Sequence, residues 1–274
     1  MGGATPADVS ALTDLTGDVV VVTGASSGIG QAAAEIYAAA GATVVVLGRS
    51  AARVAEVVAG ITAGGGSGHG YSVDVSERGA VDAVFAQIAA DVGQPTVVVA
   101  NAGIAGGASY RDDVGRLDGY TDAEWDEVIA VNLTGTFETV RAAARVLGPG
   151  ARILVTASTA GLRADPMVSY AYVATKAAIL NFVRQVALEL APRGIRVNAV
   201  APGPFKGTRI GDGKTEISPE FEREWSSTIP LGRMGTMREI QGPMLFLVSP
   251  ASTFITGAIL AVDGGALALS HTGF

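Results

Sequence analysis

The sequence predicts an α/β fold in which a mainly parallel sheet carries helices on both faces. Between residues 18 and 200, apolar β-branched runs alternate with stretches of helix formers, which is typical of parallel strands joined by crossover helices. One of these runs, residues 19–22, consists of valines only and suits a strand buried on both faces. The 274 residues contain no evident linker and 49% of them are hydrophobic, so we expect one doubly wound domain over residues 1–274 with a sizeable core.

Periodicity and local signals place the elements. Strands are expected at residues 19–22, 43–47, 71–73, 96–100, 153–157, 195–200 and 258–262. Helices are expected to begin near Gly28 and to cover residues 51–63, 76–90, 121–147 and 170–190. Further helix starts are marked by the capping boxes Thr121/Glu124 and Thr236/Glu239 and by the pair Ser218-Pro219.

Three segments fall outside this alternation. The glycine-rich residues 64–70 read as a flexible loop, and residues 1–14 as a flexible N-terminal extension. Residues 203–235 are rich in Gly, Pro and charge, and a long insertion of this kind in a compact domain is usually a functional lid.

The turn after the first strand has the composition of a phosphate-binding loop. Residues 23–30 read TGASSGIG, and Gly28, Gly30 and Ala33 fit G-x-G-x-x-G/A at a strand-to-helix junction. A pyrophosphate at such a helix N-terminus meets unpaired N–H groups and the positive end of the helix dipole. The segment therefore predicts a dinucleotide site that includes Gly24, Ser26, Ser27, Gly28, Ile29 and Gly30.

Two other interpretations of this turn exist. Residues 24–28 also match G-x-S-x-G, the nucleophile elbow of α/β-hydrolases. A serine hydrolase needs a histidine base, and the chain offers only His69 in a glycine-rich stretch and His271 near the end. The remaining interpretation is a glycine-rich turn that binds no ligand.

Composition excludes several classes of function. A net charge of −7 without a run of Lys or Arg argues against nucleic-acid binding. The chain has no cysteine, and its two histidines are far apart, so no metal site is expected. No apolar run approaches the roughly 18 residues of a membrane span, and the N-terminus lacks the features of a signal peptide. We therefore expect a cytoplasmic protein without membrane contact.

Tyr172 and Lys176 stand four residues apart on a predicted helix and therefore share one face. A tyrosine titrates near pH 10, and lowering its pKa to near 7 takes roughly 4 kcal/mol. An ammonium about 4–5 Å away supplies most of that at an effective dielectric constant of about 20. The pair is thus a candidate acid–base unit, and the alternative is an ordinary pair on a helix surface.

Six short motifs occur in the order found in the short-chain dehydrogenase/reductase family, which the chain resembles over about residues 15–265. They are TGASSGIG at 23–30, NAG at 101–103, NLTG at 132–135, STAG at 158–161, YVATK at 172–176 and PG at 202–203. The resemblance implies a Rossmann-type sheet of seven strands, a nicotinamide cofactor, and a symmetric homotetramer in which the helices of residues 121–147 and 170–190 pair.

The resemblance also implies roles for individual residues. The catalytic residues would be Asn132, Ser158, Tyr172 and Lys176. Tyr172 would exchange a proton with the substrate oxygen, Ser158 would hydrogen-bond that oxygen, Lys176 would lower the pKa of the tyrosine and hold the nicotinamide ribose, and Asn132 would brace a water. Further cofactor contacts would come from Asp74 (to the adenine), Val75, Asn101, Ala102, Gly103, Pro202, Gly203, Phe205 and Thr208 (to the carboxamide).

Three features depart from the family pattern. Ser158 and Tyr172 are fourteen residues apart, one more than is common, and Tyr170 is a decoy because Ala174 follows it four residues later. The stretch at 103–121 is somewhat long. The stretch PGPFKGT holds one extra residue before Thr208.

The end of the second strand predicts the choice of cofactor. An NAD enzyme of this type places Asp or Glu about 20 residues after the glycine turn, where it accepts from the ribose 2′-OH. This chain has Gly48 there, followed by Arg49. A guanidinium can form charge-assisted hydrogen bonds with a 2′-phosphate, which favours NADP(H) over NAD(H). The alternative is that Arg49 only faces solvent at the strand end.

The predicted function is therefore NADP(H)-dependent interconversion of a small-molecule ketone and a secondary alcohol. One alternative is a 3-oxoacyl-(acyl-carrier-protein) reductase, for which Arg163, Lys206, Arg209 and Lys214 are candidate docking residues. An alternative of another class is a regulatory protein that binds NADP(H) without turnover.

Overall fold

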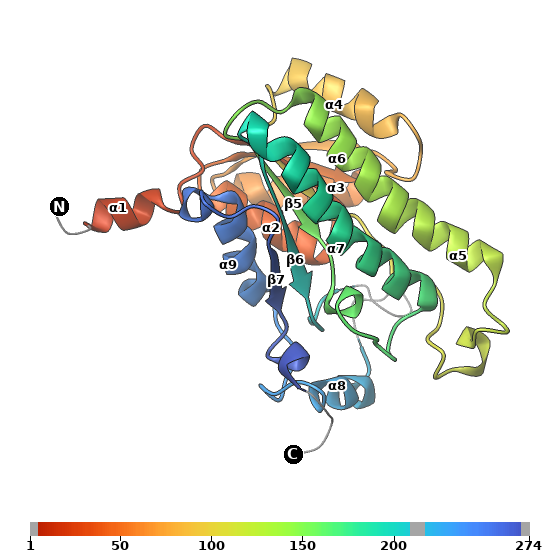
Figure 1. The fold of residues 1–274 in the computed structure, drawn as a ribbon. Helices are drawn as coiled ribbons and strands as arrows, with labels where there is room; N and C mark the ends of the chain where they lie inside the picture. Colours follow the sequence, from red (N-terminus) through yellow and green to blue (C-terminus); the bar gives the residue numbers. More distant parts are fainter. Residues whose placement is uncertain (1–4, 209–216, 270–274) are drawn as a thin grey trace.

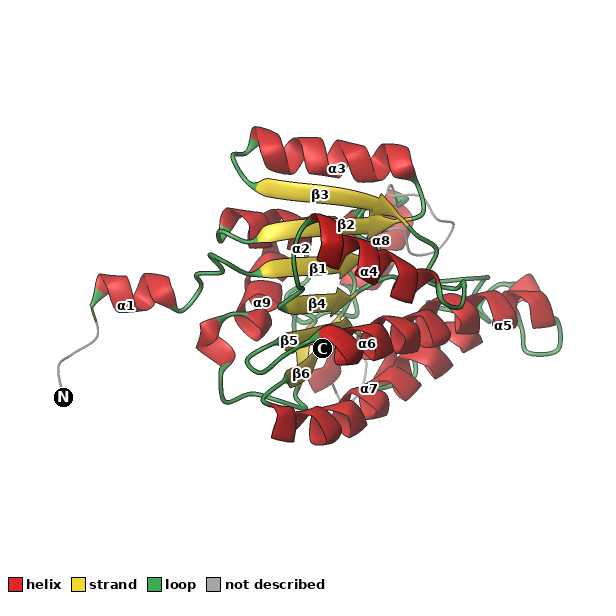
Figure 2. Cartoon of the chain, turned by 90° about the horizontal axis from the view of Figure 1, so that it is seen from above, coloured by secondary structure: helices red, strands yellow, loops and turns green. Residues whose placement is uncertain are grey.

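The computed structural model describes residues 5–208 and 217–269. Its centre is a parallel sheet of seven strands in the order β3-β2-β1-β4-β5-β6-β7 (Figures 1 and 2). The strands are β1 (Val19–Thr23), β2 (Thr43–Gly48), β3 (Ser67–Ser72), β4 (Val97–Ala100), β5 (Arg152–Thr156), β6 (Arg196–Pro202) and β7 (Ile259–Val262). The predicted α/β class and the seven-stranded Rossmann-type sheet are confirmed.

Helices cover the sheet on both faces and create two cores. The first contains residues of α4 (Ala80–Asp91), α6 (Gly135–Val146) and α7 (Tyr170–Leu190), and the second contains residues of α2 (Gly28–Ala39), α3 (Ala51–Ala63) and α9 (Met237–Val248). Val21 lies in the first core, whereas Val20 and Val22 lie in the second. This alternation explains the four consecutive valines of the strand: successive side chains point to opposite faces, and both faces are buried.

The strand order reverses next to β1, which pairs with β2 on one side and with β4 on the other. In an open parallel sheet the loops after the two strands at such a point diverge and leave a crevice at the carboxyl edge. The segments that follow β1, β2, β4, β5 and β6 therefore meet around one cleft.

Several local signals in the sequence are confirmed. Thr121 and Glu124 form a reciprocal capping box at the start of α5 (Asp122–Val128). An equivalent box begins α9, and the Ser218 hydroxyl caps α8 (Pro219–Ser226) with proline at the first helical position. α7 spans the 21 residues predicted for it.

The prediction of a flexible loop at residues 64–70 is wrong, because strand β3 begins at Ser67 and pairs with β2. The reason lies in packing against α3. A Cβ at Gly68 would lie 3.2 Å from Ile61 Cγ2, and one at Gly70 would lie 2.6 Å from Val54 Cγ1. The glycines let α3 approach this edge strand closely, and their small size hides the strand pattern in the sequence.

The helix predicted at residues 121–147 contains an irregular segment. Between α5 and α6 the backbone is π-helical at Ile129–Thr134. A π-helical turn inserts an extra residue and is frequent at functional sites. Here the segment contains Asn132, whose main-chain carbonyl accepts from the Thr136 hydroxyl at 2.6 Å. Another helix, predicted at residues 76–90, begins later, at Ala80, because Asp74 and Ser76 form a turn before it and Gly79 caps it with a φ of +82°.

The first helix forms a short arm. α1 (Pro6–Ala11) has no buried residue and projects from the body of the molecule (Figures 1 and 2). Over the described residues, none of the helices is long and apolar enough to cross a membrane.

Candidate active site

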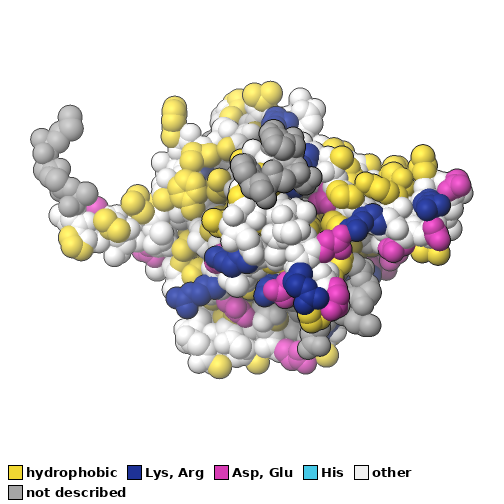
Figure 3. Space-filling model, turned by 90° about the horizontal axis from the view of Figure 1, so that it is seen from below, with side chains coloured by type: hydrophobic (Ala, Val, Ile, Leu, Met, Phe, Trp, Pro, Cys, Tyr) yellow, Lys and Arg dark blue, Asp and Glu magenta, His cyan; other side chains and the backbone are white. Residues whose placement is uncertain are grey.

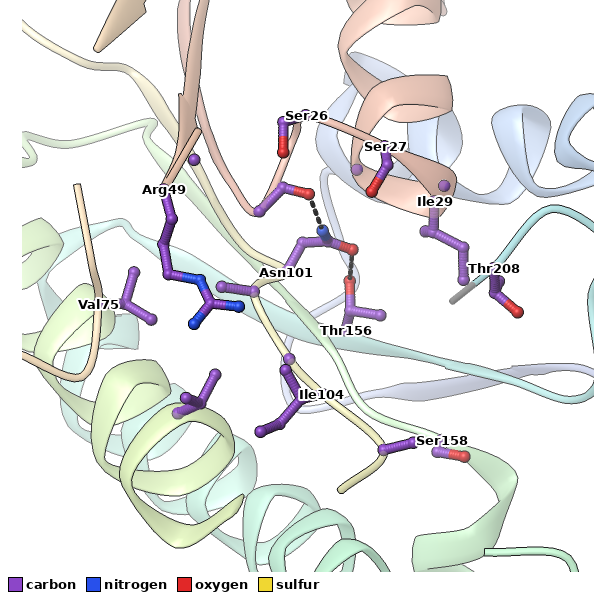
Figure 4. Close-up of a pocket in the computed structure, with 18 of the residues that line it drawn as sticks. Ser26, Ser27, Ile29, Arg49, Val75, Asn101, Ile104, Thr156, Ser158 and Thr208 are labelled. Carbon is purple, nitrogen blue, oxygen red and sulfur yellow. Dashed lines mark hydrogen bonds between the residues drawn. The ribbon is translucent and has the colours of Figure 1, made fainter. Parts of the chain in front are cut away.

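A cleft of about 590 Å³ lies at the carboxyl edge of the sheet, where the strand order reverses. Of the predicted site residues, those that line it are Gly24, Ser26, Ser27, Gly28, Ile29, Gly30, Arg49, Asp74, Val75, Asn101, Ala102, Gly103, Ser158, Tyr172, Lys176, Pro202, Gly203 and Thr208. Figure 4 shows how side chains from both halves of the sheet point into this cleft. The fold thus brings together residues that are up to 184 positions apart, from Gly24 to Thr208.

The glycine turn fits a dinucleotide pyrophosphate. Gly24 has a φ of +64°, and a Cβ there would lie 2.7 Å from Ala102 Cα. A Cβ at Gly30 would lie 2.4 Å from Asn101 Nδ2, so glycine is required at both positions. Ser27, the N-cap of α2, makes no side-chain cap hydrogen bond. The first N–H groups of this 12-residue helix are therefore free of a side-chain cap and open toward the cleft, as an anion site needs.

Ser158, Tyr172 and Lys176 lie on one wall of the cleft and are all nearly buried, with exposed fractions of 8%, 8% and 4%. Ser158 follows β5, and the other two are one turn apart on α7. The hydroxyl of Ser169 accepts from the Tyr172 N–H and thereby caps α7 next to the phenol-bearing turn. The Lys176 Nζ lies 5.5 Å from the centre of the Tyr172 ring and donates to the main-chain carbonyl of Thr156 at 2.8 Å.

Burial dominates the protonation of this pair. It raises the pKa of Tyr172, against the opposing effect of a hydrogen bond with Ser158, and it lowers the pKa of Lys176 to about 8. From the sequence we expect Lys176 to lower the pKa of the Tyr172 phenol to near 7. The side chains of the protein alone do not have this effect, because the pKa of Tyr172 is raised. The physical reason is that a charge on either group loses hydration in this wall, so each favours its neutral form.

Asn132 is not among the residues that line the cleft, and its predicted role of bracing a water stays a prediction. It is fully buried, and its amide makes two hydrogen bonds with the main chain of Ile104, accepting from N at 2.8 Å and donating to O at 2.9 Å. A Cβ at Gly103 would lie 3.3 Å from Asn132 Oδ1 and 3.7 Å from Lys176 Nζ. Asn132 therefore fixes the segment after β4 beside the lysine.

Phe205 is also absent from the cleft lining, so its predicted contact with the cofactor does not come from a side chain in the cleft. Its side chain is 4% exposed and lies in the second core, where Gly235 makes room for the ring. Its carbonyl accepts from the Thr208 hydroxyl at 3.0 Å, and Thr208 does line the cleft despite the extra residue before it.

The opposite end of the cleft is charged. Arg49 is 60% exposed, and its guanidinium lies 4.0 Å from the Asp74 carboxylate. Burial favours a higher pKa for Asp74, but hydrogen bonds from Ser76 and the charge of Arg49 outweigh it and hold this pKa below its usual value. Asp74 thus stays ionised and keeps Arg49 at the cleft edge.

Sequence reasoning missed several residues of the lining. Two of them are charged. Arg53 lies in the first turn of α3, four residues after Arg49, and Glu127 lies near the end of α5, four residues before Val131. Thr156 stands two positions before Ser158, so strand alternation was the signal that would have placed it on the same side. Nothing in their local sequence distinguishes the other two from surface charges.

The fold and this site define a dinucleotide-binding oxidoreductase. The chain belongs to the short-chain dehydrogenase/reductase family, whose members are NAD(P)-dependent enzymes acting on alcohols and ketones. A family model described as enoyl-(acyl carrier protein) reductase matches residues 24–266.

Among its relatives, 2-(S)-hydroxypropyl-CoM dehydrogenase 3 of Xanthobacter autotrophicus is 36% identical, over 93% of this chain and 98% of the relative. The 3-oxoacyl-(acyl-carrier-protein) reductase of Aquifex aeolicus is also 36% identical, over 92% of this chain and 98% of its own length. A crystal structure of a dehydrogenase/reductase from Sinorhizobium meliloti 1021 superposes with a TM-score of 0.86 at 32% identity, covering 95% of this chain and 99% of that chain.

Proposed function

We propose that the protein reduces a small ketone, or oxidises the corresponding secondary alcohol, with NADP(H). The observation that carries this proposal is that Ser158, Tyr172 and Lys176 form one wall of the cleft that also contains the glycine turn. When bound, the nicotinamide supplies or accepts a hydride. The residues of the chain then have to bind the carbonyl oxygen and handle its proton.

The protonation states suit a reductase near neutral pH. Because burial raises the pKa of Tyr172, its phenol is protonated there and can donate to an oxygen that becomes negative. The Ser158 hydroxyl can donate a second hydrogen bond to that oxygen. Lys176, with a pKa of about 8, is mostly charged at pH 7 and supports the developing phenolate.

The preference for NADP(H) is supported by charges at the adenine end. Arg49 and Arg53 both line the cleft, and Gly48 supplies no carboxylate against a 2′-phosphate. Arg53 lies in the first turn of α3, where the helix dipole also favours an anion. The carboxylate of Asp74 is paired with the guanidinium of Arg49, so its negative charge is partly neutralised and opposes a 2′-phosphate less.

A small substrate fits the surroundings better than an acidic acyl carrier protein, which is the alternative. Arg163 donates to the Ala266 carbonyl and Lys206 pairs with Glu222 of α8, while the other two candidate docking residues, Arg209 and Lys214, lie outside the described residues. α8 also carries Glu220 and Glu224. On the face seen in Figure 3, basic side chains are interspersed with acidic ones. A non-catalytic NADP(H) sensor would have no use for Tyr172 at this wall.

We also propose a homotetramer. Trp125 on α5, Phe137 on α6 and Leu188 on α7 are exposed by 40%, 40% and 73%, and Phe137 lies 6.1 Å from the partly buried Phe182 of α7. Three helices, α5, α6 and α7, thus present apolar side chains outward, as a self-complementary interface needs.

A panel of ketones and alcohols, with NADPH oxidation or NADP⁺ reduction followed by absorbance, tests the proposed function. We expect turnover with at least one small neutral ketone and weaker turnover with acyl-carrier substrates. Binding of NADPH without turnover of any carbonyl compound would favour the sensor, and selective reduction of a carrier-bound 3-oxoacyl group would favour the alternative reductase.

A further inference from the structure

Thr156, the last residue of β5, has two separate contacts that join the two halves of the cleft. Its main-chain carbonyl accepts from Lys176 Nζ at 2.8 Å, and its hydroxyl donates to Asn101 Oδ1 at 3.0 Å. The side chain is only 8% exposed and lines the cleft. Figure 4 shows the side chain of Asn101 between Thr156 and the glycine turn.

The direction of these hydrogen bonds follows from the chemistry of the groups. Asn101 Nδ2 donates to the carbonyls of Thr23 at 3.0 Å and Gly24 at 3.2 Å. Carbonyl oxygens only accept, so the NH₂ end of the amide must face them. The Oδ1 end therefore faces Thr156, and because an amide oxygen only accepts, the hydroxyl must be the donor.

The Asn101 amide has little freedom to move. A Cβ at Gly30 would lie 2.4 Å from Asn101 Nδ2 and 2.4 Å from the Gly24 carbonyl oxygen. The amide is therefore closely packed against the first turn of α2. A shift or flip of the amide would remove two hydrogen bonds from the carbonyls of the glycine turn. Among the described residues, Thr156 provides the side-chain hydrogen bond to Oδ1 that opposes such a flip.

We propose that Thr156 is a positioning residue whose hydroxyl holds the Asn101 amide against the glycine turn and so keeps the cofactor site in fixed relation to Lys176. The inference rests on the proposed function, since it concerns binding of NADP(H). Without the hydroxyl, the partly buried Asn101 Oδ1 loses its side-chain donor, and the turn that receives the pyrophosphate loses its support. The effect should fall on the dissociation constant of the cofactor more than on kcat.

The test compares Thr156→Val, Thr156→Ala and Thr156→Ser by the equilibrium Kd for NADPH, measured from its fluorescence in the absence of substrate. The valine variant keeps the shape, and the alanine and serine variants differ from one another only by the hydroxyl. We expect Thr156→Val and Thr156→Ala to weaken binding about 5- to 13-fold, the upper part of the range for the net loss of one hydrogen bond, and Thr156→Ser to stay within about threefold of wild type.

Thr139→Val is the matched control. Thr139 is also buried, and its hydroxyl donates to the Gly135 carbonyl within α6 at 2.8 Å, away from the cleft lining. This variant should lower the melting temperature without changing the Kd. A double-mutant cycle with Asn101→Ala adds a second criterion: Thr156→Ala should have almost no further effect once the amide is absent.

The outcomes separate the two proposals. If wild type binds no NADPH, the proposed function fails. If wild type binds NADPH but the alanine and serine variants at position 156 bind it equally well, or if Thr139→Val weakens binding as much as Thr156→Val, the role of Thr156 is refuted while the proposed function stands. Should the valine variant not fold, the alanine and serine pair alone decides.

Discussion

The Lys176 ammonium lies 5.5 Å from the centre of the Tyr172 ring, and burial shifts the pKa of the lysine down and that of the tyrosine up. The proton affinities of the two groups therefore move apart, because burial disfavours the charged form of each: the phenol holds its proton more tightly and the ammonium less tightly. At neutral pH the pair consists of a neutral phenol and a mostly charged amine, which is the arrangement that a proton donor to a carbonyl oxygen requires.

The first prediction concerns Tyr172→Phe. This change removes the proton donor but keeps the ring in its buried place, so we expect kcat to fall by at least about 100-fold, the low end for a general acid, while the Kd for NADPH stays nearly the same. Steady-state kinetics and fluorescence titration check the two parts. Turnover within threefold of wild type would show that Tyr172 is not the proton donor.

The second prediction concerns the pH dependence of stability. The pKa of Lys176 is about 8 in the folded protein and about 10.5 when unfolded, so between these values the unfolded chain binds more protons. Stability then rises with pH across this window, and the folded state carries a cost of roughly 3 kcal/mol at pH 7 that fades above pH 8. Lys176→Met has no such titration.

We therefore expect wild type to gain free energy of unfolding relative to Lys176→Met as the pH rises from 7 to 9.5, measured by urea denaturation at each pH. The tyrosine acts later and in the opposite direction: its raised pKa reduces stability only above about pH 10. If wild type gains no free energy of unfolding relative to Lys176→Met between pH 7 and 9.5, or loses some, the burial of a charged lysine would be contradicted.

The third prediction concerns the cofactor. Arg49→Ala should lower the ratio of kcat/KM for NADPH to that for NADH by about 10- to 150-fold, because a charge-assisted hydrogen bond contributes roughly 1.5–3 kcal/mol. Arg53→Ala should lower it further. Arg116→Ala is the control, since Arg116 is 64% exposed and paired with Asp113, as Arg49 is with Asp74, but lies outside the cleft lining.

A wild type that prefers NADH, or an Arg49→Ala variant with an unchanged ratio, would refute this assignment. The structure also refines the choice of variants. A Cβ at Gly48 would lie 3.0 Å from Ser26 Oγ, so Gly48→Asp forces Ser26 to move and mixes a steric effect with the charge effect.

The fourth prediction concerns closure over the substrate side, where residues 203–235 are expected to form a lid. Among its described residues, α8 is joined to the segment after β4 by the ion pair Arg111–Glu224, and Arg111 Nη1 also lies 2.8 Å from Met167 Sδ. Arg111→Ala should speed hydrogen exchange in α8 by up to about fivefold, as expected for an exposed ion pair. In wild type, the same exchange should slow when cofactor and a substrate analogue bind together.

Glu220→Gln is the matched control for this experiment, because Glu220 lies on the same helix and its ion pair among the described residues is with Arg223 of that helix. If hydrogen exchange in α8 is accelerated equally in both variants, the ion pair of Arg111 with Glu224 does not stabilise α8. Exchange that is unchanged by formation of the ternary complex would count against a lid.

The fifth prediction concerns assembly. Light scattering at micromolar concentration should give the mass of a tetramer, and Phe137→Asp should lower this mass by placing a charge on the α5–α6 and α7 surface. Val114→Asp changes an equally apolar residue that is 73% exposed but lies in the loop before α5, and it should leave the mass unchanged. A monomer in wild type would overturn the proposal.

The sequence by itself determined the α/β class, the glycine turn at the start of α2, the limits of α7 and the helix caps at Thr121 and Thr236. These features depend on neighbours within about five residues or on a simple repeat along one element, so a linear pattern contains them. The sequence motifs also identify Ser158, Tyr172 and Lys176 as matches to the catalytic residues of the family, without reference to their positions in space.

Tertiary structure alone decided the rest. It made residues 67–72 a strand, because glycine is needed where α3 packs closely on the edge of the sheet. It placed the ring of Phe205 in the second core and the amide of Asn132 against the main chain of Ile104. It also set the protonation of Tyr172 and Lys176 and linked Thr156 to Asn101. All of these depend on burial and on contacts between distant segments, which spacing along the chain does not encode.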